Sequence, residues 1–384
     1  MAGGPGLNAT APALVEHHAS HGKLLTTVEV RDCPRGEVDA IIVPTNRPWS
    51  YLGTAADVAA ALGRPLVVLT SGAAAPDRAA KLARTRGIEM LVVDVTALPT
   101  SLMPRLSATA KVLSPTEFVR HTDTSFKRNL GLLVSRVVGW ERVAFLDDDI
   151  SVPTPSDLDA AAGLVSQGYG AVGLKVGGFP DNSVVCHAHR ETGGEQGTFI
   201  GGGALVIGRE SMTSFFPTIY NEDWFFLLDD AGLRRSAITG EVKQKPYDPF
   251  ANELRAQMEE FGDCLAEGVF ALLDDDGGFE AAADEGYWTE FLLGRMALID
   301  SILGRIESRG RRDDEALRME IALRAARKRC EAIPASLCVR YLKALAQDRR
   351  TWAAHVEGFP SAAVDLRGSM RALGLVGHGT YVAR

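Results

Sequence analysis

The chain has 384 residues, of which 46% are hydrophobic and 23% charged, and its formal net charge is -8 at pH 7. This length accommodates one large α/β domain with additions, or two domains, and the composition is typical of a globular protein. The acidic balance argues against nucleic-acid binding by the whole chain. The charge is uneven, because residues 301–384 carry 16 Lys and Arg against 9 Asp and Glu.

The first 36 residues are rich in Gly, Ala, Pro and His and are expected to form a flexible leader. His17, His18 and His21 could bind a metal ion there, although a solvated tail is the simpler interpretation. The leader lacks the pattern of a signal peptide, and no window approaches the ~18 apolar residues of a membrane helix. The five cysteines form no CxxC pair, so we expect reduced thiols in a cytoplasmic protein.

Three strands alternate with helices in the next part of the chain. The strands are predicted at residues 38–44 (VDAIIVP), 65–70 (PLVVLT) and 89–95 (EMLVVDV). The β-α-β-α-β order predicts a parallel sheet with right-handed crossovers. A polar turn, Thr45-Asn46-Arg47-Pro48, follows the first strand at the edge where such sheets bind ligands.

The clearest helix has Leu130, Leu133, Val134, Val137 and Val138 on one face. It begins with Lys127, Arg128 and Asn129, and cations at a helix start oppose the helix dipole. Their presence is explained if an anion also occupies this helix end, and the alternative is that they are solvated.

The helix leads into the apolar strand 142–146, which is followed by Asp147-Asp148-Asp149. Three charges cannot lie unpaired inside a sheet, because the desolvation of each costs several kcal/mol. The aspartates are therefore expected at the C-terminal edge of this strand. A hard divalent cation would remove the repulsion between them.

Strands are also predicted at residues 170–176, 183–189 (SVVCHAH) and 199–207 (FIGGGALVI). The glycines around Gly202 would let the backbone approach a ligand, though a simple bulge explains them equally well. Glu222 and Asp223 lie between aromatic and apolar residues, in surroundings that raise a carboxylate pKa towards that of a general base. Alternatively, Asn221 or Asp223 caps a helix that begins at Trp224.

Residues 249–384 are predicted to be mostly helical. Asp274-Asp275-Asp276, followed by two glycines, is interpreted as a solvated loop that ends a helix. The stretch 313–329 has Leu317, Ile321 and Ala325 on one side, and is expected to be a surface helix. A basic membrane-surface face is the alternative.

Together these motifs resemble the GT-A glycosyltransferases, particularly the inverting type. The motifs are PTNRP, the KRN helix start, the DDD strand end, a Gly-rich strand and NEDW, within residues 38–230. The resemblance implies a Rossmann-like, mostly parallel sheet flanked by helices, with a helical C-terminal extension. The expected division is a leader at 1–36, a catalytic domain at 37–248 and a helical region at 249–384.

The resemblance also implies roles for individual residues. Thr45, Asn46 and Arg47 would touch the nucleotide base and ribose, with Arg128 or Asn129 close by. Asp147 would face the ribose or sugar, and Asp149, with Asp147, would bind Mn²⁺ or Mg²⁺. Asp148 and Gly202 would also belong to the donor-binding site. Asp223 would deprotonate the acceptor hydroxyl, with Glu222 as the alternative base.

The resemblance therefore implies a hexosyltransferase that uses a nucleoside diphosphate sugar and an unidentified hydroxyl acceptor. No histidine follows Asp223 before the helical region, so a third metal ligand found in many retaining members is not evident, which favours inversion. The alternatives are a haloacid-dehalogenase-like phosphatase with Asp147 as nucleophile, a nucleotidyltransferase, and a non-catalytic binding protein. The transferase interpretation requires that the aspartates and Asp223 share a cavity rather than being occupied by arginines or far apart.

Overall fold

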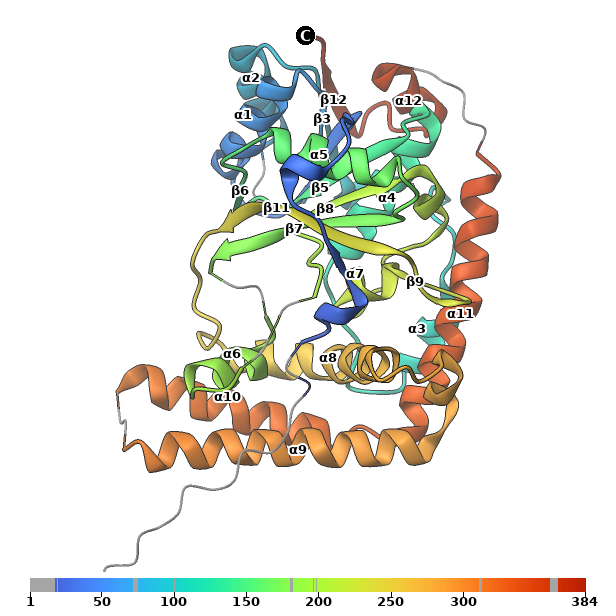
Figure 1. The fold of residues 1–384 in the computed structure, drawn as a ribbon. Coiled ribbons are helices and arrows are strands. Elements are labelled where there is room, and N and C mark those ends of the chain that lie inside the picture. The colour runs from blue at the N-terminus through green and yellow to red at the C-terminus, as the bar shows by residue number, and fades with distance from the viewer. Residues whose placement is uncertain are drawn as a thin grey trace, which may run out of the picture.

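The computed structural model describes residues 18, 20–71, 75–99, 101–179, 182–195, 197, 199–310, 313–359 and 365–384. A central sheet is flanked by helices, and long C-terminal helices form a further layer beneath it in Figure 1. The strands are β1 (Thr26–Thr27), β2 (Ala40–Thr45), β3 (Leu66–Thr70), β4 (Met90–Asp94), β5 (Arg142–Leu146), β6 (Ile150–Ser151), β7 (Ala171–Gly178), β8 (Ala204–Gly208), β9 (Leu228–Asp229), β10 (Gly232–Leu233), β11 (Ser236–Gln244) and β12 (Gly379–Val382). The helices are α1 (Gly53–Leu62), α2 (Pro76–Arg86), α3 (Ser107–Leu113), α4 (Thr124–Val138), α5 (Ser156–Val165), α6 (Val184–Glu191), α7 (Glu222–Phe226), α8 (Glu253–Asp274), α9 (Glu285–Ser308), α10 (Asp314–Glu331), α11 (Ala335–Glu357) and α12 (Leu366–Ala372).

The main sheet has the strand order β1-β11-β7-β8-β5-β2-β3-β4-β12, with β6 paired to β11. Strands β5, β2, β3 and β4 are parallel, whereas β8 is antiparallel to both β5 and β7. The predicted α/β class, with a mostly parallel sheet and a helical C-terminal part, is confirmed. Because β2 and β5 are parallel neighbours, the polar turn after β2 and the aspartates after β5 emerge at the same edge.

Alternating side chains of β2 separate two hydrophobic layers, since successive residues of a strand point to opposite faces. Ile42 packs on the face that α4 and the C-terminal helices cover. Ile41 and Val43 pack on the opposite face, under α1, α2 and α5. Buried residues of α8, α11 and α12 belong to the same hydrophobic cluster as Ile42. Most of the buried residues of α10 form a separate, third apolar cluster with α6 and the C-terminal half of α9.

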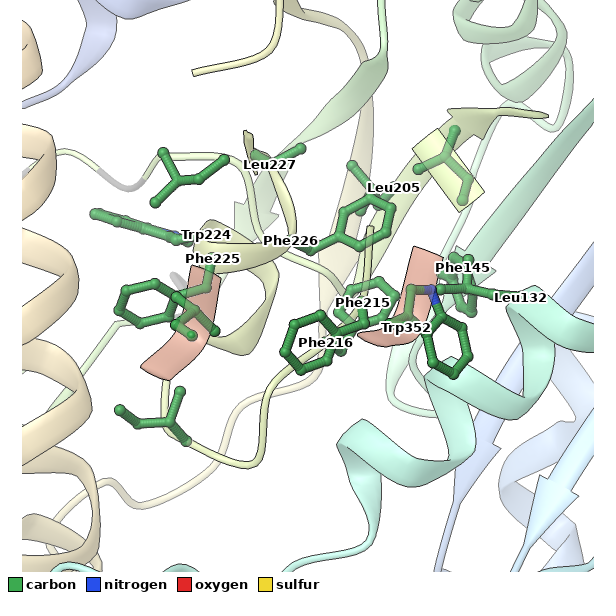
Figure 2. Packing of buried hydrophobic residues seen from close by; sticks show 14 of the residues in the cluster. Leu132, Phe145, Leu205, Phe215, Phe216, Trp224, Phe225, Phe226, Leu227 and Trp352 are labelled. Carbon is green, nitrogen blue, oxygen red and sulfur yellow. The ribbon is translucent and has the colours of Figure 1, made fainter. Parts of the chain in front are cut away.

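Aromatic rings couple the sheet to the short helix α7 (Figure 2). Phe145 of β5 meets Phe216 edge-on at a centroid distance of 5.5 Å, and Phe216 stacks on Phe226 of α7 at 4.3 Å. Trp224 and Phe225 are also buried. Such rings bury a large apolar area in a fixed geometry, so the start of α7 is held in place relative to the end of β5.

The prediction of a strand at residues 183–189 is wrong, because this segment forms α6. Its alternating pattern suits a strand, but Ser183 caps a helix by accepting a hydrogen bond from the backbone nitrogen of Cys186 at 3.3 Å. Val184, Val185 and Ala188 then face the third apolar cluster at helical spacing.

Part of the predicted leader packs on the body of the protein. His21 is buried, and β1 pairs in parallel with β11, so the chain from residue 20 onward packs on the body. This corrects the expected boundary for residues 20–36, while residues 1–17 and 19 lie outside the described part of the chain. The physical reason is that the backbone of β1 pairs with β11 and the His21 side chain contacts Glu267. The composition of this segment reveals neither contact.

Two expectations for the helical region also need correction. Leu317 and Ile321 of α10 are exposed, and the buried stripe consists instead of Ala316, Met319, Ala322, Leu323, Ala326 and Cys330. The small residues of this stripe allow close packing on α8. The second Asp triplet does end α8, but Asp274 is buried rather than solvated.

None of the described helices is long and apolar enough to cross a membrane. On α10, Arg318, Arg324 and Arg327 pair with acidic side chains of the same protein. The membrane-surface alternative for this helix stays a prediction.

Candidate active site

The first Asp triplet lies where the sequence predicts, in the turn that follows β5. The backbone nitrogen of Asp147 donates to the carbonyl of Gly203 at 2.9 Å, which continues the pairing between β5 and β8 by one residue. The backbone nitrogen of Ile150 then donates back to the carbonyl of Asp147 at 3.1 Å and closes the turn. Three adjacent carboxylates therefore project from one turn in different directions.

Asp148 points inward and is buried. Its carboxylate accepts hydrogen bonds from the hydroxyl of Thr45 and from the guanidinium of Arg47. Burial raises the pKa of Asp148, the bonds from Thr45 and Arg47 lower it, and the neighbouring Asp147 and Asp149 raise it further, with a net upward shift. Asp148 therefore links the triplet to the turn after β2.

Asp147 and Asp149 each contact one arginine. Nη2 of Arg128 donates to Oδ1 of Asp147 at 3.0 Å, and Nη1 of Arg47 lies 2.9 Å from Oδ2 of Asp149. The Arg47 side chain is 40% exposed, whereas that of Arg128 is 4% exposed. The Arg47 side chain is therefore partly open to solvent, whereas that of Arg128 is enclosed.

Arg128 joins the aspartate turn to α7. Its Nη1 donates to Oε1 of Glu222 at 2.8 Å, and Arg120 donates to the other carboxylate oxygen of Glu222 at 3.2 Å. Burial by itself lowers the pKa of Arg128, but Asp147, Glu222 and Asp223 outweigh burial and raise the pKa above its usual value. The guanidinium therefore stays charged, and Glu222 is engaged on both oxygens.

Asp223 lies beside Glu222 but has different partners. Its Oδ2 accepts a hydrogen bond from the backbone nitrogen of Gly202, and its Oδ1 accepts one from the backbone nitrogen of Trp224 at 3.0 Å. A Cβ atom at position 202 would lie only 2.6 Å from Nη1 of Arg128. Glycine thus lets the backbone pass close to Arg128 and reach Asp223.

One cavity of about 480 Å³ collects most of the predicted site. Its lining includes Arg47, Arg128, Asp147, Asp149, Glu222 and Asp223. The transferase interpretation required that the aspartates and Asp223 share a cavity and are not occupied by arginines, and this condition is met in part. Arginines do occupy the carboxylates, but the aspartates face a cavity and Asp223 lies in the same cavity.

A smaller cavity of about 150 Å³ adjoins the first. Thr45, Asn46 and Asp148 line it, and Arg47, Asp147 and Asp149 line both cavities. The polar turn after β2 and the aspartate turn therefore meet, as expected from two parallel neighbouring strands.

The side chains at the start of α4 are buried rather than solvated. Lys127 is buried, and its Nζ donates to Asp123 at 2.8 Å, to the carbonyl of Thr45 at 2.8 Å and to the hydroxyl of Ser71 at 2.7 Å. Asn129 is buried too, and its amide bonds both the carbonyl and the nitrogen of Phe216 at 2.9 and 2.8 Å. Asn129 therefore has a structural role, which corrects its expected place near a nucleotide.

Several cavity residues escaped the sequence analysis. They are Arg120, Thr124, Gly203, Tyr220, Gln244, Tyr247, Asp248 and Arg255. Tyr247 and Asp248 follow β11, and Arg255 belongs to α8, a part of the chain predicted only as a helical extension. Residues 243–248 (KQKPYD) are a run of polar residues with a proline after a strand, like the PTNRP turn at residues 44–48. This pattern is the local signal that could have indicated the loop.

The chemistry of the aspartates suits a divalent cation. Asp147 and Asp149 offer only oxygen donors, and their side chains are 32% and 14% exposed at the cavity. Mg²⁺ is usually held by one or two carboxylates together with substrate phosphates and water. The residues present fit such a site, provided that Arg47 releases Asp149.

Comparisons with known proteins add little to this geometry. No protein-family model and no curated protein matches the sequence. Among solved structures, the chain is similar to S. aureus TarS, residues 1–349, in complex with UDP-GlcNAc, with 12% sequence identity and a TM-score of 0.35. The match covers 76% of this chain and 90% of the TarS chain.

Proposed function

We propose that the protein is a metal-dependent glycosyltransferase of the hexosyltransferase type. It would move a sugar from a nucleoside diphosphate sugar to an acceptor hydroxyl with inversion. The observation that carries the proposal is that Asp147 and Asp149, at the end of β5, share one cavity with Asp223, at the start of α7. Such a transfer needs a cation site and a base that face the same space.

The donor nucleotide is assigned to the smaller cavity, between the turn after β2 and the aspartate turn. Thr45, Asn46 and Arg47 would contact the base and ribose, and the diphosphate would extend past Asp147 and Asp149 into the larger cavity. Residues that line both cavities support this path, because a diphosphate sugar spans two adjoining spaces.

Asp149 and Asp147 would hold the divalent cation. When bound, Mn²⁺ or Mg²⁺ neutralises the charge of the departing nucleoside diphosphate. Arg47 would have to release Asp149 to make room for the ion, and its side chain is 40% exposed. Arg128 keeps Asp147 in place, because it is also tied to Glu222.

Asp223 would act as the base that accepts the proton of the acceptor hydroxyl. Two backbone N–H groups fix its orientation, while its carboxylate lines the cavity. Glu222 is the weaker candidate, because its two oxygens accept from positively charged guanidinium groups, whereas those of Asp223 accept from neutral backbone N–H groups. The base works as the sugar carbon gains oxocarbenium character, in the manner known from glycoside hydrolysis.

Donor binding and turnover test the proposal separately. A thermal-shift screen of UDP- and GDP-sugars should find one donor that stabilises the protein only with Mn²⁺ or Mg²⁺. Asp149→Asn should abolish this metal-dependent shift, whereas Asp57→Asn, a change at an exposed acid of α1, should not. Asp223→Asn should keep the shift and lower donor turnover by about 10²–10⁴, the usual contribution of a general base.

Other outcomes would identify the alternatives. A trapped aspartyl-phosphate on Asp147, without sugar-nucleotide binding, would indicate a phosphatase. Transfer of a nucleotidyl group would indicate a nucleotidyltransferase. Donor binding without any transfer or hydrolysis, unchanged in Asp223→Asn, would indicate a binding protein and refute the catalytic role of Asp223.

A further inference from the structure

Two histidines that precede β1 meet the buried aspartate at the end of α8. Nε2 of His18 lies 3.1 Å from Oδ2 of Asp274, and the rings of His18 and His21 stack with centroids 4.5 Å apart. One potential ligand atom from each of the three residues lies within 4.8 Å of the others. These residues line neither the larger nor the smaller cavity of the candidate active site.

The cluster contains several buried polar atoms without a hydrogen-bond partner. Nδ1 of His18, Nδ1 of His21 and both carboxylate oxygens of Asp274 are buried without a hydrogen-bond partner of good geometry. The Asp274 side chain is fully buried, and Lys23, 3.9 Å away, is itself 67% exposed. A buried carboxylate costs several kcal/mol unless it is paired or coordinates a metal.

We propose that His18, His21 and Asp274 form a zinc-binding site that fastens the N-terminal segment to α8. Two imidazoles and one carboxylate are ligands that suit Zn²⁺, whereas Mg²⁺ and Ca²⁺ prefer oxygen ligands alone. Ligands around a tetrahedral zinc are roughly 3.4 Å apart, as expected from Zn–N bonds of about 2.0–2.1 Å. The ligand atoms of the three side chains lie within 4.8 Å of one another, so they would draw closer together when the ion binds.

The second contact of His21 supports this assignment. Its Nε2 lies 3.0 Å from Oε2 of Glu267, which leaves Nδ1 for the metal. Histidines that bind zinc usually donate their other ring N–H to a carboxylate, and this bond fixes the tautomer and orientation. Glu267 is thus the positioning residue for His21.

A second group of potential ligands among the described residues is a weaker candidate. Glu260, Cys264 and Cys330 are all buried and lie close together. Arg295 already donates to Glu260 at 3.0 Å, so a cation there would meet a fixed positive charge. No such arginine contacts Asp274 in the part of the chain that the structure describes.

The site has a structural consequence for the core. The ring of His21 meets Trp224 of α7 edge-on at 5.3 Å and Phe270 of α8 at 5.8 Å. A metal bound to His21 would therefore stabilise the packing of Trp224 and hold α7 in position. This inference concerns metal binding and stability, and it holds whether or not the transferase proposal is correct.

Zinc binding by the chelator-treated full-length chain tests the site. Isothermal titration should find one Zn²⁺ per chain, and Co²⁺ in its place should give the visible absorption of a tetrahedral centre. His18→Ala and Asp274→Asn should each weaken Zn²⁺ binding at least roughly 10–100-fold, because loss of an outer-shell partner alone has that effect. His121→Ala, at an exposed histidine, and Cys330→Ser should bind as the wild type does.

The decisive comparison is between His18→Ala and His121→Ala, because the side chain of His18 is 23% exposed and its removal leaves the core intact. Equal zinc affinity in these two variants, or no zinc bound by the wild type, would overturn the proposal. Loss of zinc in Asp149→Asn would also overturn it, since the ion would then belong to the catalytic cavity.

Discussion

The most direct test of the site geometry is the substitution Gly202→Ala. The added Cβ atom would lie 2.6 Å from Nη1, 2.8 Å from Cζ and 3.0 Å from Nη2 of Arg128. Ordinary contacts begin near 3.4 Å, so the guanidinium must move by roughly 0.8 Å. Arg128 has little room to do so, because it is bound to Asp147 and Glu222 at the same time.

The expected cost follows from these contacts. Overpacking of a tight site costs about 1–3 kcal/mol. Complete loss of a buried ion pair would cost about 3–5 kcal/mol and sets the upper limit. We therefore expect Gly202→Ala to lower the free energy of unfolding by about 1–3 kcal/mol, and to impair donor-dependent activity because Asp147 loses its fixed partner.

Gly201→Ala is the matched control, because a Cβ atom there meets nothing within 4 Å. It should leave the free energy of unfolding within about 0.5 kcal/mol of the wild type. Urea unfolding monitored by tryptophan fluorescence measures both variants under the same conditions. If Gly202→Ala and Gly201→Ala unfold at the same urea concentration, the close approach of the backbone to Arg128 is refuted.

Three further predictions address other parts of the protein. Glu222→Gln should destabilise the protein by about 3–5 kcal/mol in urea unfolding, because it leaves two guanidinium groups without their shared carboxylate; an unchanged urea midpoint would contradict this role. Asn129→Ala should cost about 1–3 kcal/mol for each backbone group of Phe216 left without a partner, while donor affinity measured by titration stays the same. Burial, together with the charge of Arg255, lowers the pKa of His187 from 6.5 to about 3. Between pH 6.5 and about 3, the unfolded chain therefore binds a proton at His187 that the folded chain does not bind. The free energy of unfolding should fall by up to ~1.4 kcal/mol per pH unit as the pH drops through this range, and His187→Gln should reduce this slope.

The sequence was sufficient for the features that depend on local chemistry. Asp147 and Asp149 could be placed outside the sheet, because unpaired charges are too costly within a buried strand. The parallel pairing of β2, β3 and β4 followed from the alternation of strands and helices. The position of Asp223 beside a cavity was suggested by acids among aromatic residues, although its role as a base is still a proposal.

The alternation in residues 183–189 misled the prediction, because short segments with apolar and polar residues can suit both a strand and a helix. A single cap at Ser183 and the apolar cluster beyond it favoured the helix. The face of α10 was misassigned for a similar reason, since Leu317 is apolar but small residues make the closer contact with α8.

What the sequence determined by itself is where charge must leave the sheet, since desolvation acts on each carboxylate whatever the rest of the chain does. Only the tertiary structure decided which partners those charges meet. Arg128 contacts Glu222, and Asp274 contacts His18, across long separations in the chain. Such contacts depend on how the aromatic core sets α7 against β5, and no local pattern encodes that distance.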